Sequence, residues 1–181
     1  MASVIGAMSA FLIRRLNADD AVAFFELRLR CMDDAAAQFR SAPEDVEREG
    51  LAHWTARLSG DDDRIVGVFD GDILIGIGGI TRDWRVKLRH KALLFGMFVA
   101  PAATGRGIGM LIVDALIAEA QGFVSSLHLT LMADNERALA LYERAGFVVY
   151  GREPQSVMQP HNSAAHQKML NAKGWCTGPR A

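Results

Sequence analysis

Residues 104–109 read TGRGIG and place three glycines within five residues, a spacing that can bind an anion. The segment follows an apolar run and precedes residues whose apolar side chains recur at helical spacing. Glycine permits a positive φ and close approach of a ligand, and the first N–H groups of a helix have no partner within the helix. Because the helix dipole is positive at that end, the segment is a candidate site for a pyrophosphate.

Two known nucleotide-binding loops do not match this segment. A P-loop ends in Gly-Lys-Ser/Thr, but Gly109 is followed by Met110. A dinucleotide-binding loop would need a glycine at the position of Met110. Taken alone, the glycine-rich segment leaves two interpretations open, an anion site and a plain tight turn.

A second motif lies at residues 135–147, which read NERALALYERAGF and follow another apolar run. With the sequence FVAP at residues 98–101 and the glycine-rich segment, this motif resembles the GCN5-related N-acetyltransferase (GNAT) superfamily. The signatures of that family are a strand ending in Val-x-Pro, then Arg/Gln-x-x-Gly-x-Gly/Ala, then Asn-x-x-Ala-x-x-Leu/Phe-Tyr-x-x-x-Gly-Phe. The resemblance is strong over about residues 91–153 and weaker, but consistent, from residue 11 on.

The resemblance implies both a fold and an activity. The implied fold is α/β (α+β), with a GNAT-like mixed, mostly antiparallel central sheet flanked by about four helices. The implied activity is transfer of an acetyl group from acetyl-CoA to a primary amine of a small molecule or peptide, by direct attack on the thioester. Acetyl-CoA is then a co-substrate, and no metal is expected. A non-catalytic acyl-CoA-binding module remains the alternative.

The resemblance also implies roles for individual residues. Two central strands should separate near residues 97–99, where the pantetheine arm pairs with exposed backbone and a free N–H stabilises the developing oxyanion. Asn135 either hydrogen-bonds the pantetheine arm or only caps a helix. Tyr142 either protonates the departing thiolate or only packs in the core. The implied CoA-binding residues are Met97, Phe98, Val99, Thr104, Gly105, Arg106, Gly107, Ile108, Gly109, Asn135 and Tyr142, with Tyr142 also catalytic.

The sequence departs from the family pattern at two points. Thr104 stands where Arg or Gln is usual, although Arg106 can still add charge. Many relatives carry a glutamate base on the strand before Val-x-Pro, whereas residues 93–98 read LLFGMF and contain no ionisable group. A lysine-like amine of pKa about 10.4 is neutral in roughly one molecule in 2,500 at pH 7. The acceptor is therefore an easily deprotonated amine, or the base comes from elsewhere. The candidates elsewhere are Glu26, Asp33, Asp83, His90 or a water chain.

The acceptor itself is not identified by the sequence. The resemblance places it among residues 33–43, 81–91 and 152–166. The connector before the central strand is basic and suits an acidic acceptor, the CoA 3′-phosphate or a solvated arm. Acidic residues at 33, 34, 44 and 45 would instead attract a cationic amine. His128 is expected to be a structural residue.

Secondary-structure elements must position these residues. Hydrophobic periodicity, together with turn and cap signals, predicts where these elements lie. Strands are predicted at residues 11–16, 64–69, 73–80, 93–99, 124–132, 147–151 and 167–170. Helices are predicted at residues 18–32, from a Ser41 cap with Glu44 at the capping-box position to Ser59, and at 107–121 and 136–145. Asp70-Gly71 is the predicted turn of the first hairpin. The order predicts a mixed sheet with helices on its faces.

Composition bounds the remaining questions. The 181 residues are 50% hydrophobic and 23% charged, with a net charge of −1, which argues against a whole-surface field for nucleic acid or membrane. We expect one domain over residues 1–172, with a tail at 173–181.

The cysteines and the N-terminal residues bear on localisation. Cys31 and Cys176 lie far apart in the sequence, which is typical of reduced thiols. The apolar start precedes its arginines, whereas a secretory signal has its positive charge before the apolar stretch. The prediction is a cytoplasmic monomer or homodimer whose partners are acetyl-CoA and an amine acceptor.

Overall fold

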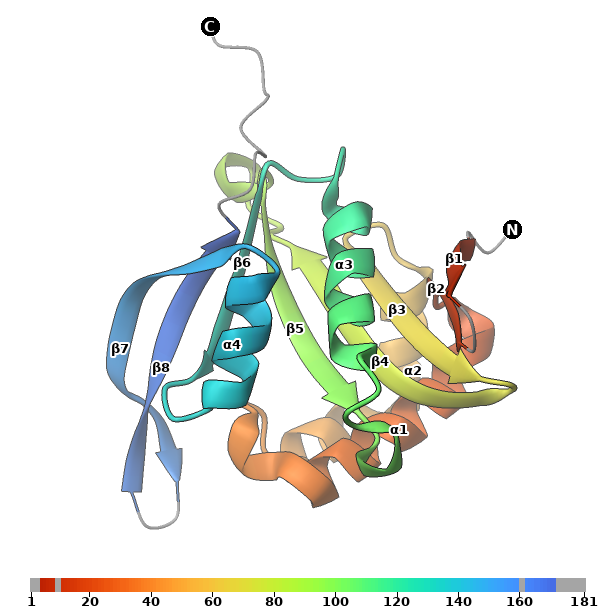
Figure 1. The fold of residues 1–181 in the computed structure, drawn as a ribbon, viewed down its shortest axis with the longest axis horizontal. Helices are drawn as coiled ribbons and strands as arrows, with labels where there is room; N and C mark the ends of the chain where they lie inside the picture. The colour runs from red at the N-terminus through yellow and green to blue at the C-terminus, as the bar shows by residue number, and fades with distance from the viewer. Residues whose placement is uncertain (1–3, 9–10, 160–161, 172–181) are drawn as a thin grey trace, which may run out of the picture.

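One eight-stranded sheet organises the protein in a computed structural model that describes residues 4–8, 11–159 and 162–171. The strand order is β1-β2-β3-β4-β5-β6-β8-β7, and only β5 and β6 pair in parallel (Figure 1). The predicted mixed, mostly antiparallel sheet is therefore confirmed, while the predicted tail at 173–181 lies outside the described residues. The strands are β1 (Val4–Met8), β2 (Phe11–Arg15), β3 (Asp63–Asp70), β4 (Ile73–Arg82), β5 (Lys91–Val99), β6 (Ser126–Met132), β7 (Phe147–Gln159) and β8 (Asn162–Asn171).

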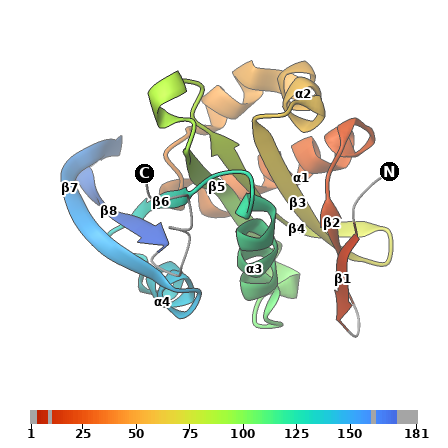
Figure 2. The ribbon, with the colours of Figure 1, turned by 90° about the horizontal axis from the view of Figure 1, so that it is seen from above.

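In this part of the chain, four α-helices cover the two faces of the sheet. They are α1 (Ala21–Ala35), α2 (Pro43–Ser59), α3 (Ile108–Ala120) and α4 (Glu136–Arg144). Helices α1 and α2 lie on one face, and α3 and α4 lie on the other (Figure 2). No helix of the described residues is long and apolar enough to cross a membrane.

The core has two layers, one on each face of the sheet. Successive side chains of a strand point to opposite faces, so Ile65 packs with the α1–α2 layer and Val66 with the α3 layer. Residues 65–69 of β3 are all buried because helices cover both faces. Trp54 of α2 is 0% exposed and anchors the α1–α2 layer.

Two local predictions were wrong by one residue. Helix α2 has Ala42, not Ser41, as its N-cap, because Pro43 occupies the first helical position. The carboxylate of Asp45, rather than Glu44, therefore accepts the backbone N–H of Ala42, at 3.0 Å. In the first hairpin Asp70 pairs with Ile73, so the turn residues are 71 and 72 instead of Asp70 and Gly71.

The structure contains more strand than predicted. Strand β1 pairs antiparallel with β2, and the sequence between them carries no Gly, Pro, Asn or Asp turn signal. Strand β7 continues through Pro154 to Gln159, beyond the predicted end at residue 151. The ladder accommodates this proline with a register break between Glu153 and Val157, where Gln155 adopts a φ of 52°.

Cys31 provides a test of this packing. The thiol is 2% exposed, and burial raises its pKa to about 12, so the reactive thiolate is scarce at neutral pH. We expect no reaction of a Cys176→Ser variant with a chromogenic disulfide reagent until the protein is unfolded. Absorbance with and without denaturant measures this. A fast, stoichiometric reaction of the native variant would contradict the buried position of Cys31.

Candidate active site

The central feature of the site is the point at which β5 and β6 separate. The two strands pair in parallel at three positions only, the last being Leu93 with His128. Strand β6 continues to pair with β8 as far as Met132, whereas β5 keeps only β4 as a partner. Among the described residues, the edge of β5 that faces β6 is thus unpaired over residues 94–99. The sequence predicted the separation near residues 97–99, but in the structure it begins earlier, after Leu93.

A β-bulge distorts β5 within this unpaired stretch. Gly79 pairs with Phe95 and Ile77 pairs with Phe98, so Gly96 and Met97 together lie opposite Gly78. Gly96 has a φ of +64°, a conformation that most side chains disfavour. The extra residue of a bulge leaves the hydrogen-bonding ladder. The backbone N–H groups at Gly96 and Met97 are therefore the candidate donors to a developing oxyanion.

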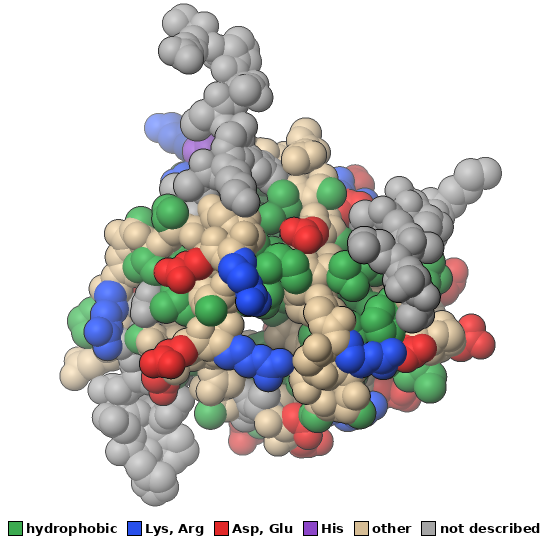
Figure 3. All heavy atoms as spheres, in the orientation of Figure 1, with side chains coloured by type: hydrophobic (Ala, Val, Ile, Leu, Met, Phe, Trp, Pro, Cys, Tyr) green, Lys and Arg blue, Asp and Glu red, His purple; other side chains and the backbone are tan. Residues whose placement is uncertain are grey.

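A cleft of about 1020 Å³ opens between the separated strands. Its walls are residues 93–99 of β5, residues 129–131 of β6, the N-terminal ends of α3 and α4, and residues 38–41 after α1. Figure 3 shows an opening in the face that carries α3 and α4, with basic side chains beside it. The cleft-lining basic residues of α4 are Arg137 and Arg144, which the sequence analysis did not identify.

The glycine-rich segment forms one mouth of the cleft. Gly107 caps α3 with a φ of +79°, and a Cβ at Gly105 or Gly107 would meet no atom within 4 Å. The backbone N–H groups of residues 105–109 donate no hydrogen bond to any described residue. Five successive free donors at a helix N-terminus match the requirements of a pyrophosphate.

All but one of the predicted CoA-binding residues line the cleft. The exception is Arg106. Its guanidinium lies 3.1 Å from the carboxylate of Asp70 and stacks over the ring of Phe11 at 4.5 Å. The structure thus directs the charge of Arg106 toward the hairpin and away from the cleft, because a local carboxylate and an aromatic ring bind it there.

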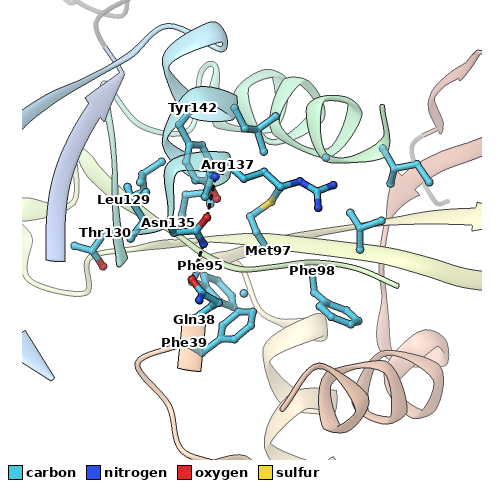
Figure 4. Close-up of a pocket in the computed structure, with 18 of the residues that line it drawn as sticks. Gln38, Phe39, Phe95, Met97, Phe98, Leu129, Thr130, Asn135, Arg137 and Tyr142 are labelled. Carbon is cyan, nitrogen blue, oxygen red and sulfur yellow. Dashed lines mark hydrogen bonds between the residues drawn. The ribbon is translucent and has the colours of Figure 1, made fainter. Parts of the chain in front are cut away.

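Asn135 caps α4 and also bridges the cleft. Its Oδ1 accepts the backbone N–H of Ala138 at 3.0 Å, which is the predicted cap. Its Nδ2 donates to Oε1 of Gln38 at 2.7 Å, which joins the segment after α1 to α4 (Figure 4). No sequence signal indicated Gln38, because the two residues are far apart in the chain. A contact of Asn135 with the pantetheine arm stays a prediction.

The position of Tyr142 is compatible with both of the roles that the sequence left open. Its ring is 6% exposed and packs edge-on against Phe147, with the ring centroids 5.7 Å apart. The same residue lines the cleft (Figure 4). Burial raises the pKa of the phenol well above its ordinary value of 10, so Tyr142 keeps its proton throughout the neutral range. Tyr142 therefore carries a proton at neutral pH, which the predicted acid role requires.

None of the four predicted bases Glu26, Asp33, Asp83 and His90 lines the cleft. Asp83 instead binds Arg85 in the connector, with a closest distance of 2.6 Å. Two other carboxylates, those of Asp34 and Glu49, line the cleft. Glu49 belongs to no motif. It lies next to Gly50, where α2 is kinked and φ is +67°.

The basic connector has its own counter-ions. Arg82 and Arg89 both contact the carboxylate of Asp62, and Arg85 contacts Asp83. Of the six basic residues from 82 to 91, none lines the cleft. The interpretation as a solvated arm therefore fits the structure better than direct recognition of an acidic acceptor.

His128 lies beside the cleft and supplies a pH prediction. Its Nε2 lies 2.7 Å from the Ser126 hydroxyl, and burial, then Lys91 and His90, lower its pKa from 6.5. Because the unfolded state binds the proton more tightly, the free energy of unfolding falls as the pH drops through 6.5. A His128→Gln variant should lose part of this fall between about pH 7.5 and pH 5.5 in urea titrations. Identical pH slopes for both proteins would contradict this assignment.

Comparisons with known proteins agree with this geometry. The profile of the acetyltransferase (GNAT) family matches residues 19–147. A curated relative, the N-alpha-acetyltransferase RimI of Mycobacterium tuberculosis, is 35% identical over 97 residues, which are 53% of this chain and 59% of the relative. The chain thus spans less than two thirds of the length of this curated relative.

Two solved structures show the same fold. The first is yncA, a putative acetyltransferase from Salmonella typhimurium with its cofactor acetyl-CoA. It has a TM-score of 0.78 and 22% identity over 96% of this chain and 99% of that chain. The second is a ribosomal-protein-alanine N-acetyltransferase from Brucella melitensis, with a TM-score of 0.76 and 22% identity over 88% and 98%. The family profile covers more than half of the sequence, and the chain therefore belongs to the acetyltransferase (GNAT) family.

Proposed function

We propose that this protein transfers the acetyl group of acetyl-CoA to a primary amine of a small molecule or peptide. One observation carries the proposal: the N–H groups of residues 105–109 donate to no described residue, and four of these five residues, all but Arg106, line a cleft that also contains a free strand edge and a protonated tyrosine. Family membership supports the same chemistry, as does the relative from M. tuberculosis that is named as an N-alpha-acetyltransferase.

The residues present fit acetyl-CoA. The N–H groups of residues 105–109 would bind the pyrophosphate, where the absence of Cβ atoms at Gly105 and Gly107 leaves room. The unpaired edge of β5 at Met97–Val99 would hold the pantetheine arm as an added strand does. Arg137 and Arg144, which line the cleft, would add positive charge in place of Arg106.

The proposed reaction needs no covalent enzyme intermediate. The bound co-substrate supplies an activated thioester, and the amine nitrogen bonds to its carbonyl carbon as the C–S bond breaks. A backbone N–H at the Gly96–Met97 bulge stabilises the oxyanion. Tyr142 donates its proton to the departing sulfur, and the Glu49 carboxylate accepts the proton that the amine loses.

The proposal includes the setting of the reaction. We propose a single domain over residues 1–172 that acts in the cytoplasm, as a monomer or homodimer, without nucleic acid. The continuous sheet of the described residues supports a single domain. The two widely spaced cysteines support a reducing compartment, and the net charge of −1 argues against binding to nucleic acid.

Turnover with a panel of amines tests the proposal against its alternative. Purified protein is mixed with acetyl-CoA and each amine, and free thiol release is followed together with the mass of the product. We expect thiol and acetylated amine in equal amounts for at least one amine. A non-catalytic acyl-CoA-binding module, which the absence of a glutamate on β5 favours, would bind acetyl-CoA tightly and acetylate none of them.

A further inference from the structure

The α1–α2 side of the cleft contains a buried cation that forms no ion pair within 4.0 Å with any described residue. Arg28 of α1 is 6% exposed and is the one buried charged residue of the described chain, yet it lines the cleft. Its Nε has no hydrogen-bond partner among the described residues. The guanidinium is held instead by the ring of Trp54, over which it stacks at 4.3 Å. A buried guanidinium that lacks hydrogen bonds is costly unless a ligand supplies them.

A carboxylate faces the same side of the cleft and is also unpaired. Oε2 of Glu49 is buried and has no hydrogen-bond partner in the described part of the chain. Glu49 is near enough to raise the pKa of Arg28 against the lowering by burial, but no ion pair within 4.0 Å joins the two. The neighbouring Arg57 differs, because it is bound to Asp63 through two hydrogen bonds. This side of the cleft thus presents a buried guanidinium nitrogen and a buried carboxylate oxygen that have no hydrogen-bond partner among the described residues.

The position of Arg28 relative to the bulge limits the size of a ligand. A Cβ built on Gly96 would lie 3.3 Å from a terminal guanidinium nitrogen of Arg28. Gly96 is part of the bulge at which the thioester carbonyl is proposed to lie. A group that Arg28 binds therefore lies next to the reacting carbon, and only a very short spacer can separate it from the attacking amine.

We propose, resting on the acetyl transfer above, that the acceptor is a free α-amino acid whose carboxylate binds Arg28 and whose ammonium group faces Glu49. A guanidinium recognises a carboxylate through two parallel hydrogen bonds, and an α-amino acid separates its two charges by a single carbon. A protein N-terminus lacks this carboxylate, because a peptide bond replaces it. A lysine side chain places its amine too far from one.

The reaction balances with the groups named. The amine nitrogen forms a bond to the acetyl carbon, the carbon–sulfur bond breaks, and free CoA leaves as the thiol with the proton of Tyr142. Glu49 takes one proton as the ammonium becomes a nucleophile and passes it to solvent. The second proton, which the nitrogen loses as the amide forms, replaces through solvent the proton that Tyr142 gave to the sulfur. The product is an N-acetylamino acid, whose carboxylate remains bound to Arg28 until release.

The first arm of the test uses the unmodified protein. With acetyl-CoA, each of the common free amino acids is compared with its own amide and with a dipeptide that starts with it. At least one free amino acid should have a kcat/KM about 100-fold above that of its amide and dipeptide, because a site built for a polar group rejects analogues without it. Equal or better turnover of the amides or peptides would overturn the carboxylate assignment. No turnover of any amine would overturn acetyl transfer itself.

The second arm uses variants at Arg28. Arg28→Met should lower kcat/KM for the free amino acid about 100-fold and leave the slow reaction of the amide unchanged. Arg28→Lys should recover part of the loss, since lysine keeps the charge. The affinity for acetyl-CoA, measured by calorimetry, should stay at the wild-type value and shows that the variants are folded. Arg30→Met is the matched control, an exposed residue of the same helix, and should behave as wild type. Equal losses for acid and amide would reduce Arg28 to a structural residue.

Discussion

Replacing Tyr142 with phenylalanine should lower kcat by about 100-fold and change the affinity for acetyl-CoA far less, as expected for the loss of a general acid. The ring contact with Phe147 and the buried volume are kept, so only the hydroxyl is lost. A thiolate leaves more easily when a proton arrives with the developing charge. Rapid-quench measurement of kcat and calorimetry of acetyl-CoA binding separate the two effects. An unchanged kcat would remove Tyr142 from the acid role.

The pH profile adds an independent check on Tyr142. Its pKa is raised by burial, so the protonated, active form persists above the ordinary value of 10. Titration of Tyr142 should therefore cause no fall in kcat between about pH 8 and pH 10. A fall in that range that is present in the wild type and absent in the phenylalanine variant would contradict a buried, protonated tyrosine.

Replacing Gly107 with valine should raise the Kd of acetyl-CoA by about 10- to 100-fold, because backbone strain at such a position costs about 1–3 kcal/mol. The residue adopts a φ of +79° at the N-terminus of α3, which a β-branched side chain strongly disfavours. Relief of the strain moves the N–H groups that are proposed to bind the pyrophosphate. Calorimetric titration with acetyl-CoA measures the change.

Gly122 offers a matched control for this variant. It has a φ of +75°, no atom within 4 Å of a built Cβ, and a position after the other end of α3, outside the cleft. Gly122→Val and Gly107→Val should lower the Tm by similar amounts. Gly122→Val should, however, leave the Kd of acetyl-CoA unchanged. Equal losses of affinity in both variants would show that the effect of Gly107 is global.

The local structure around the candidate site could be predicted where short segments encode it. The glycine-rich segment, the cap at Asn135 and the strand before Pro101 each depend on neighbours within a few residues, and the structure has them as predicted. The extension of β7 beyond residue 151 was not predicted. It runs through Pro154, a residue that usually interrupts a strand, and a register break in the ladder accommodates it.

The acceptor side could not be predicted in the same way. Arg28, Gln38 and Glu49 come from three separate elements and carry no motif, and tertiary packing alone brings them into one cleft. Arg106 was predicted to bind CoA because of its position in the glycine-rich motif. In the structure its side chain instead contacts Asp70 and Phe11, outside the cleft. In both cases the position of the side chain depends on contacts with residues that are distant in the sequence.

A crystal structure with bound CoA is the most direct test of the central claim, that the cleft between β5 and β6 is the acyl-CoA site. The pyrophosphate oxygens should lie within about 2.7–3.2 Å of the N–H groups of residues 105–109. The pantetheine arm should pair with the free edge of β5, and the sulfur should lie beside the hydroxyl of Tyr142. A CoA molecule bound elsewhere, or one whose sulfur points away from Tyr142, would contradict the account.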